Sequence, residues 1–240
     1  MGVWARLGRQ GLPALLIVYT GLTLAYNFTF PPQEPSDEPA HYRYVRWLLD
    51  EHSLPVARPD EGSEFHQPPL YYALAGLFAW PVRVAPNALP QLYDIRSNPH
   101  RGYHYWEPGP DNKNLWLHGP WDLWPFPPAA LSVHLARLAS LVCGLVTVYA
   151  AYHAARLFFE TAAALAAAAV VAFNPMFLAV SASLQNDAGA AATGAVAIWI
   201  CLVGLRRGFT ARRALLLGLV PALGALMKIT AIFLLPAAVL

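Results

Sequence analysis

The chain has 240 residues, of which 57% are hydrophobic and only 12% are charged, with a formal net charge of +2. Soluble domains carry about a quarter charged residues, so this composition excludes an ordinary water-soluble protein and indicates a membrane protein. The two cysteines, Cys143 and Cys201, both lie in apolar segments and have no metal-type spacing, which argues against a disulfide framework.

The first apolar run covers residues 11–30 and follows Arg6 and Arg9. A basic start before an apolar run is also typical of a signal peptide, but no clear small-residue cleavage site follows. We therefore expect a retained first transmembrane helix in segment 1–30, with the N-terminus in the cytoplasm.

Residues 31–130 form a polar, aromatic and proline-rich insert. This segment holds 12 of the 14 acidic residues, 6 of the 8 histidines and 18 of the 22 prolines. Two short helices are predicted in it, near 37–52 and 70–84. The second is interrupted by Pro81 and Arg83, so we interpret it as an interfacial or re-entrant helix.

The helix near 37–52 begins with two adjacent acids, Asp37 and Glu38, after Ser36, which is a good helix N-cap. Acids in a first turn favour the helix dipole and need no further role. The alternative is that one of these carboxylates acts as a general base.

The helical phase favours this alternative. At 100° per residue, Asp37 and His41 lie on the same side as the apolar residue Tyr44, whereas Arg46 lies on the opposite side. We therefore expect Asp37 to face the protein and Arg46 to face solvent.

Four further spans are predicted after the insert. They cover residues 131–158, 161–181, 188–205 and 214–240. The arginine-rich segment 206–213 indicates a cytoplasmic loop, so an even number of crossings must precede it. The predicted fold is an all-α polytopic membrane protein with about five transmembrane helices and an extracytoplasmic first loop that carries interfacial helices.

Two other polar features lie near or within these spans. Ser183, Gln185, Asn186 and Asp187 lie between the third and fourth predicted spans, which fits an ordinary loop or a lining of the same external cleft as Asp37. A lysine within a span, such as Lys228, is costly and indicates a functional site, although its side chain could also snorkel to the interface.

The metal-binding signal is weak. His100 and His104 have helical i, i+4 spacing, but Pro99, Gly102 and Pro108 disfavour a helix, and no carboxylate completes a ligand set. No phosphate-binding loop or dinucleotide motif is present either, so we expect no nucleic-acid partner and no certain cofactor.

Several short motifs occur together in one order along the chain. They are Pro35-Ser36-Asp37-Glu38-Pro39-Ala40-His41-Tyr42, Leu54-Pro55, Gln67-Pro68-Pro69-Leu70-Tyr71-Tyr72, the helix from Arg137 to Phe158, Asn174-Pro175, Ser183 to Asp187, and Lys228. This order resembles the GT-C type integral membrane glycosyltransferases, which include the protein mannosyltransferases and the aminoarabinose transferases.

The resemblance implies a membrane enzyme that takes a sugar from a polyprenyl-phosphate carrier. Asp37 and Glu38 match the family's catalytic acidic pair. The implied substrate-binding residues, with a divalent metal in members that use one, are His41, Gln67, Asn186, Asp187 and Lys228. Gln67 departs from the basic residue or histidine that many members have before the two prolines.

The implied reaction is an inverting transfer to an acceptor hydroxyl on a lipid, glycan or protein, on the extracytoplasmic side of what we expect to be a bacterial plasma membrane. Many members have about a dozen spans, so we expect this chain to be a fragment or a short relative. Two other functions remain open: a non-catalytic membrane subunit of a larger complex, and a transporter for a lipid-linked substrate.

Overall fold

The structure is a computed structural model that describes residues 3–57, 63–84, 98 and 114–234. These residues form helices and connecting segments without any strand, which confirms the all-α prediction. The elements are α1 (Val3–Thr29), α2 (Glu38–Glu51), α3 (Leu70–Ala79), η2 (Pro120–Asp122), α5 (Pro128–Ala136), α6 (Leu138–Ala155), α7 (Thr161–Ala172), α8 (Pro175–Ser181), α9 (Asp187–Arg207), α10 (Ala211–Met227) and η3 (Ile229–Leu234).

Three helical stretches in the described part of the chain are long and apolar enough to cross a membrane. They are Gln10–Thr29, Pro128–Ala155 and Asp187–Arg207. Helices α7 and α8 count as a fourth span if they are taken together across their 64° bend. The described residues therefore contain three or four such spans instead of about five.

The last expected span, 214–240, ends early in the structure. Helix α10 stops at Met227, and Lys228 has the extended dihedral angles φ −148° and ψ 132°. A short 3₁₀ segment, η3, follows it. The sequence predicted a continuous helix through Lys228, whereas in the structure Lys228 lies at a break between α10 and η3.

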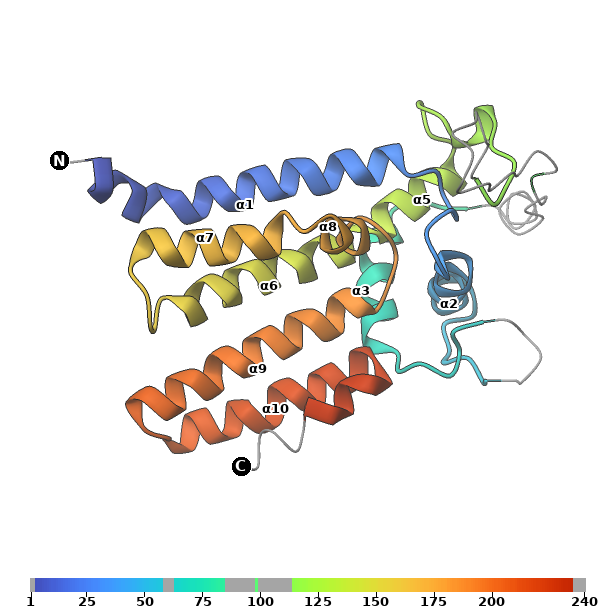
Figure 1. Cartoon of the computed structure of the whole chain (residues 1–240). Helices are drawn as coiled ribbons and strands as arrows, with labels where there is room; N and C mark the ends of the chain where they lie inside the picture. Colours follow the sequence, from blue (N-terminus) through green and yellow to red (C-terminus); the bar gives the residue numbers. More distant parts are fainter. Residues whose placement is uncertain (1–2, 58–62, 85–97, 99–113, 235–240) are drawn as a thin grey trace, which may run out of the picture.

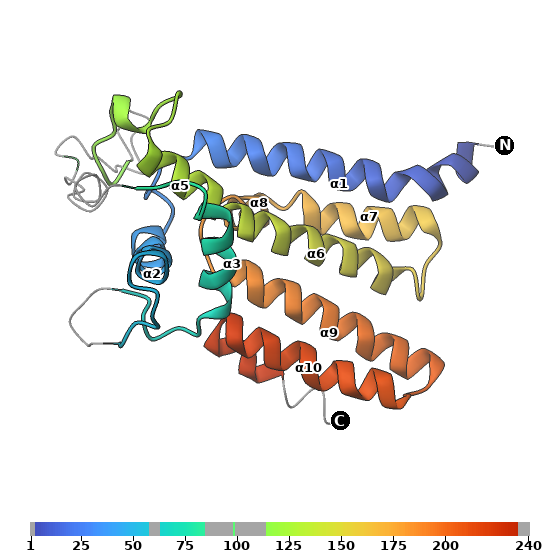
Figure 2. The ribbon, with the colours of Figure 1, turned by 180° about the vertical axis from the view of Figure 1, so that it is seen from behind.

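The long helices lie side by side, and the short ones gather at one end of them (Figure 1). Helix α6 is central, because it packs against α1, α7 and α9, and α10 packs against α9. Helix α3 crosses the ends of the long helices, and α2 lies beyond it, as the reverse view also shows (Figure 2). With only ten residues, α3 is too short to span a bilayer.

The two ends of the bundle differ in what they hold. The start of α1 and the α9–α10 turn lie at one end, whereas α2, α3 and the α8–α9 turn lie at the other (Figure 1). The basic N-terminal segment and the arginine-rich turn therefore share one end. Which end faces the cytoplasm stays a prediction from the arginine distribution.

Small residues bring the long helices close together. Ala164, Ala168 and Ala172 are fully buried at i, i+4 spacing on α7, facing α1 and α6. A Cβ atom on Gly144 of α6 would lie 2.1 Å from the Tyr19 hydroxyl oxygen. Close backbone approach at these positions is how membrane helices gain packing without a hydrophobic driving force between them.

A second apolar cluster seats α2 and α3 on the bundle. Tyr42 and Val45 of α2 and Tyr71 and Tyr72 of α3 are fully buried, and they pack with Leu184 of the α8–α9 turn. Burying aromatic side chains of this size contributes most of the apolar stabilisation in such a cluster. This packing holds the first loop over the end of the long helices.

The start of α2 differs from the prediction. The helix begins at Glu38, and its N-cap is Asp37, not Ser36. Asp37 has φ 59°, a left-handed conformation, so helical phase does not extend to it. The predicted orientation of Asp37 is consequently wrong, because its side chain is exposed. The prediction for Arg46 is wrong for a separate reason: within the regular helix it is 6% exposed and forms an ion pair with Asp50.

Candidate active site

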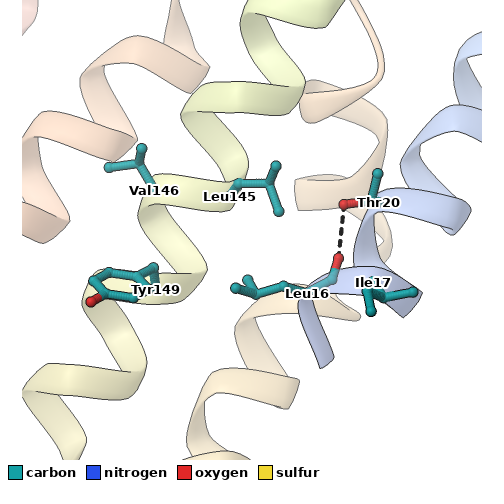
Figure 3. A pocket seen from close by; sticks show the side chains of 6 residues that line it. All are labelled: Leu16, Ile17, Thr20, Leu145, Val146 and Tyr149. Atoms are coloured by element: carbon teal, nitrogen blue, oxygen red, sulfur yellow. Dashed lines mark hydrogen bonds between the residues drawn. The ribbon is translucent and has the colours of Figure 1, made fainter. Parts of the chain in front are cut away.

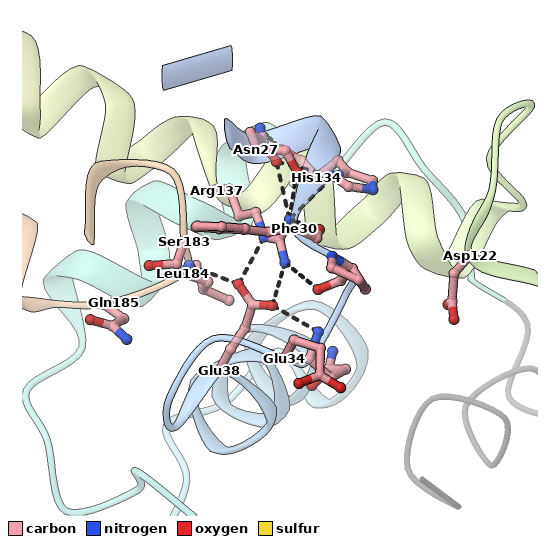
Figure 4. Close-up of polar contacts among 12 residues, drawn as sticks. Asn27, Phe30, Glu34, Glu38, Asp122, His134, Arg137, Ser183, Leu184 and Gln185 are labelled. Atoms are coloured by element: carbon pink, nitrogen blue, oxygen red, sulfur yellow. Dashed lines mark hydrogen bonds and ion pairs between the residues drawn. The ribbon is translucent and has the colours of Figure 1, made fainter. Parts of the chain in front are cut away.

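The carboxylate of Glu38 is the centre of a buried polar network (Figure 4). Its Oε1 accepts hydrogen bonds from Arg137 Nε at 2.8 Å and from the Leu184 backbone N–H at 2.9 Å. Its Oε2 accepts from Arg137 Nη2 at 2.6 Å and from the Gln33 backbone N–H at 2.8 Å. Both charged side chains are 0% exposed. A carboxylate with four donors and no exposure cannot contact a substrate, so Glu38 is not placed to act as the base.

Arg137 joins the same network to the end of α1. Its Nη1 donates to the carbonyl oxygens of Asn27 and Phe30, both at 2.8 Å, and its Nη2 donates to that of Pro31 at 3.0 Å. These bonds satisfy carbonyls that the end of a helix leaves without partners. The cost of burying the guanidinium charge is offset because each of its nitrogen atoms donates to an acceptor.

Sequence reasoning missed Arg137 as a partner of Glu38. Arg137 lies in an apolar stretch that was predicted to span the membrane, and a charge at that depth is itself a signal of a paired or functional residue. The same reasoning that singled out Lys228 would have found it.

Asp37 contrasts with its neighbour. Its side chain is exposed, makes no helix-capping hydrogen bond, and has no hydrogen bond or ion pair to the described residues. The left-handed backbone is tolerated by aspartate better than by most residues, because a short polar side chain causes little steric conflict there. The buried Glu38 network thus fixes the backbone, and the Asp37 carboxylate is left without a hydrogen-bond or ion-pair partner in the described part of the chain.

His41, one turn further along α2, is 5% exposed and reaches α3. Its Nδ1 lies 2.9 Å from the Tyr72 hydroxyl oxygen, which also lies 3.5 Å from Asn186 Nδ2 at the start of α9. The sequence predicted that Asn186 binds substrate directly, but its side chain is only 1% exposed in this structure. The contact of its side chain at this side of the site is with the Tyr72 hydroxyl.

Lys228 meets an anion at the same end of the bundle. Its Nζ lies 2.6 Å from Asp187 Oδ1, and the two side chains are 20% and 55% exposed. Met227, the residue before Lys228, packs closely on Gly189, where a Cβ atom would lie 2.6 Å from its Sδ. Gln67 lies nearby, since its Oε1 is 3.5 Å from the Ile229 backbone nitrogen.

The first loop also contains a second carboxylate–histidine cluster. His118 Nε2 lies 2.7 Å from Glu34 Oε1, and its Nδ1 lies 2.8 Å from Asp122 Oδ2. Burial alone would lower the pKa of His118, but the hydrogen bonds to Asp122 and Glu34 outweigh burial and raise that pKa above its ordinary value. Glu34 further accepts from the backbone N–H groups of Leu115 and Trp116, both at 2.9 Å.

A pocket of about 380 Å³ opens between the segment before α2 and helix α8. Its lining includes Glu34 and Ser36 on one side, and Ser183 and Gln185 on the other. Gln185 Nε2 donates to the Ser36 carbonyl at 2.7 Å, which ties the α8–α9 turn to the residue before Asp37. The pocket therefore adjoins the acidic motif.

A larger pocket lies elsewhere and has a different character. It measures about 520 Å³ between α1 and α6 and is lined by Leu16, Ile17, Thr20, Leu145, Val146 and Tyr149 (Figure 3). On the α1 side of this pocket, the hydroxyl of Thr20 donates a hydrogen bond to the Leu16 backbone carbonyl. Apart from the hydroxyls of Thr20 and Tyr149 the lining is apolar, which suits lipid chains.

Metal-binding side chains do not cluster in the described part of the chain. No group of three or more His, Cys, Asp or Glu there is arranged to hold a metal ion. His100 and His104 lie outside the described residues.

Comparison with known proteins gives one result. Residues 132–240, a little under half of the chain, match the family model described as dolichyl-phosphate-mannose-protein mannosyltransferase. No match was found among curated proteins or among solved structures. The matched part contains Arg137, which contacts Glu38 of the acidic motif, Asn186, which contacts Tyr72, and the pair formed by Asp187 and Lys228. Over residues 132–240, the chain is thus similar to the protein mannosyltransferases, and this similarity supports a membrane glycosyltransferase of the GT-C type.

Proposed function

We propose that the protein transfers a sugar from a polyprenyl-phosphate carrier to an acceptor hydroxyl, with Asp37 as the general base. The supporting observation is the division of labour between two adjacent acids. Glu38 is buried and held by four hydrogen-bond donors, while the carboxylate of Asp37 is exposed and unoccupied beside it. A general base needs an accessible carboxylate in a fixed position, and this arrangement supplies both.

The proposed reaction is a single displacement at the anomeric carbon of the sugar. The acceptor oxygen attacks the anomeric carbon, and its proton passes to the Asp37 carboxylate. The bond between the anomeric carbon and the carrier phosphate breaks, and the phosphate leaves with the electron pair. Attack opposite the leaving group inverts the anomeric configuration. No nucleotide is needed, because the energy of transfer is stored in the lipid–phosphate linkage.

Lys228 would offset the charge that develops on the departing phosphate. Its present partner, Asp187, is more than half exposed, so the pair can open when an anion arrives. We further propose that Asp187 and Gln67 contact the sugar or the acceptor at this side. Glu38 is a positioning residue in this proposal, because it holds the backbone that presents Asp37.

The proposed surroundings rest on the arginine distribution in the sequence. We propose that the end of the bundle with α2 and α3 faces the extracytoplasmic side of a bacterial plasma membrane, with residues 31–130 outside and the N-terminus in the cytoplasm. The donor would be a lipid-linked sugar and the acceptor a lipid, a glycan or a protein, with hexose or pentose as the transferred group.

The test is sugar transfer by the purified protein in lipid nanodiscs. Labelled polyprenyl-phosphate mannose is the first donor, because the matching family uses a mannosyl donor by its description; other hexoses and pentoses are tried next. Asp37→Asn should lower the rate about 10²- to 10⁴-fold, the range expected for losing a general base.

The matched control is Glu51→Gln, which also converts a carboxylate to an amide but lies exposed at the far end of α2. It should retain full activity. If Asp37→Asn also retained full activity, Asp37 would not be the base. If the wild-type protein transferred no sugar from any donor, the non-catalytic subunit would become the better explanation.

A further inference from the structure

His41 lies in a chain of polar groups that runs from α2 through α3 to α9. Tyr72 stands between His41 and Asn186, and Tyr72 and Asn186 are 0% and 1% exposed. These residues belong to three different helices, so their meeting is a product of the tertiary structure. The role of this polar chain rests on the proposed function, because it concerns how the same site presents a hydrogen-bond donor.

The hydrogen bonds of this polar chain all run in the same direction, from Asn186 to His41. The Asn186 amide nitrogen can only donate, so the Tyr72 oxygen accepts from it. The Tyr72 hydroxyl hydrogen is then free for an acceptor, and His41 Nδ1 lies within hydrogen-bond distance. A neutral imidazole that accepts at Nδ1 carries its hydrogen at Nε2.

The environment also keeps the ring neutral. Burial lowers the pKa of His41 below its ordinary value, against the opposing attraction of Glu64, Asp37 and Glu38, and Lys228 lowers it further. The ring is held in place as well, since it stacks on Tyr72 with ring centroids 5.7 Å apart. Tyr72 in turn stacks on Tyr44 at 3.9 Å with parallel planes.

The Nε2 atom of His41 is not fully buried. It has no hydrogen-bond partner among the described residues, and it is not one of the buried polar atoms that lack a partner. It therefore touches accessible space. The charged groups that influence this ring are Asp37, Glu38, Glu64 and Lys228, which come from α2, from the segment before α3, and from the break after α10.

We propose that Tyr72 and Asn186 are positioning residues that fix His41 in the Nε2–H form, so that His41 presents one hydrogen-bond donor beside Asp37. A neutral N–H donor suits an uncharged oxygen, such as a hydroxyl of the transferred sugar or of the acceptor. The carrier phosphate would be left to the ammonium group of Lys228. Asn186, although it touches no substrate, would then influence transfer through Tyr72.

The direct test is the ¹⁵N spectrum of histidine-labelled protein in nanodiscs by solid-state NMR, because the two tautomers differ in the shifts of Nδ1 and Nε2. The His41 signals are assigned by their loss in His41→Gln. The wild type should show a protonated Nε2 and an unprotonated Nδ1. Tyr72→Phe, which removes only the hydroxyl, should give a mixture of tautomers.

Two further variants sharpen the test. Tyr44→Phe removes a hydroxyl from the same aromatic stack that has no hydrogen bond to the described residues, so it should leave the His41 spectrum unchanged. Asn186→Asp replaces a donor by an acceptor for the Tyr72 hydrogen, which should reverse the chain and move the His41 proton to Nδ1. Retention of the Nε2–H form in both Tyr72→Phe and Asn186→Asp would overturn the proposal.

Transfer kinetics provide the functional readout. Tyr72→Phe should lower kcat roughly 3- to 30-fold and move the acidic limb of the pH profile to higher pH, since the neutral ring loses a stabilising donor. Tyr44→Phe should do neither. If the tautomer changes as expected but the wild type transfers no sugar, the proposed function fails while the positioning chain stands. If transfer occurs but kcat and the pH profile do not respond to Tyr72→Phe, the positioning role is wrong.

Discussion

Two ion pairs at the same end of the bundle show how burial separates a structural role from a reactive one. Glu38 and Arg137 are both 0% exposed. Besides their mutual ion pair, Arg137 donates to a backbone carbonyl of α1, and Glu38 accepts from a backbone N–H of the α8–α9 turn. Asp187 and Lys228 are 55% and 20% exposed and meet through one contact. Removing one partner of a fully buried pair leaves a charge without solvent, whereas an exposed charge is hydrated again. The first pair holds the end of the bundle together, and the exposure of the second is what the proposed role of Lys228 in binding the carrier phosphate requires.

The largest effect is expected for Arg137→Met. The variant leaves the Glu38 carboxylate buried without its cation, which should lower the free energy of unfolding by about 3–5 kcal/mol. The measurement is an SDS titration of the protein in mixed micelles. Arg212→Met, at an exposed position in the first turn of α10, is the control and should be nearly neutral. Equal losses of unfolding free energy in the two variants would mean that the buried ion pair contributes no more to stability than an exposed arginine does.

Glu38→Gln is expected to cost less, about 1–3 kcal/mol, because the amide keeps one acceptor oxygen but turns an N–H₂ group towards other donors. Asp37→Asn, one residue away, should change the free energy of unfolding by no more than about 0.5 kcal/mol, as exposed substitutions do. The two variants are compared by the same titration. A stability loss at Asp37 as large as that at Glu38 would contradict the division between the two acids.

Lys228→Met should lower the free energy of unfolding by at most about 1 kcal/mol, because its ion pair is partly exposed. Sugar transfer should fall much more than stability does. A double-mutant cycle with Asp187→Asn measures the coupling of the pair directly. A coupling energy as large as that of the Glu38–Arg137 cycle would show that the exposed pair is structural as well.

The smallest effect concerns pH and the His118 cluster. The pKa of His118 is raised in the folded state. The contribution of its hydrogen bonds with Glu34 and Asp122 to the free energy of unfolding is therefore complete below the ordinary pKa of histidine, and it is lost as the pH rises through the raised pKa. The thermal midpoint of the wild type should fall by a few degrees more than that of His118→Gln between pH 6 and pH 9. Parallel curves for the two proteins would rule out this titration.

The sequence predicted correctly what depends on composition and local pattern. The apolar runs indicated an all-helical membrane protein, and the interruption of the 70–84 segment predicted a helix too short to span. The order of the motifs indicated the GT-C type of glycosyltransferase, and the family match over residues 132–240 confirms it. These features are encoded within a few turns of chain, or in the order of short motifs.

Periodicity failed where a single residue broke the helix. The predicted phase required α2 to continue through Asp37, but the left-handed backbone there removes the relation between phase and direction. The same limit applies at Lys228, where α10 ends although the apolar composition continues. Hydropathy reports how much of a segment is apolar and not where its hydrogen bonds stop.

What the sequence determined by itself is the class of protein and the set of candidate groups, because hydropathy, charge and motif order are local properties. What only the tertiary structure decided is the role of each group. Glu38 meets Arg137 across 99 residues and the Leu184 backbone across 146 residues. Asn186 is buried behind Tyr72, and Asp37 alone of the two acids remains accessible. Burial and hydrogen bonding depend on which distant segments pack together, and that packing buries one acid in a structural network and leaves the other exposed.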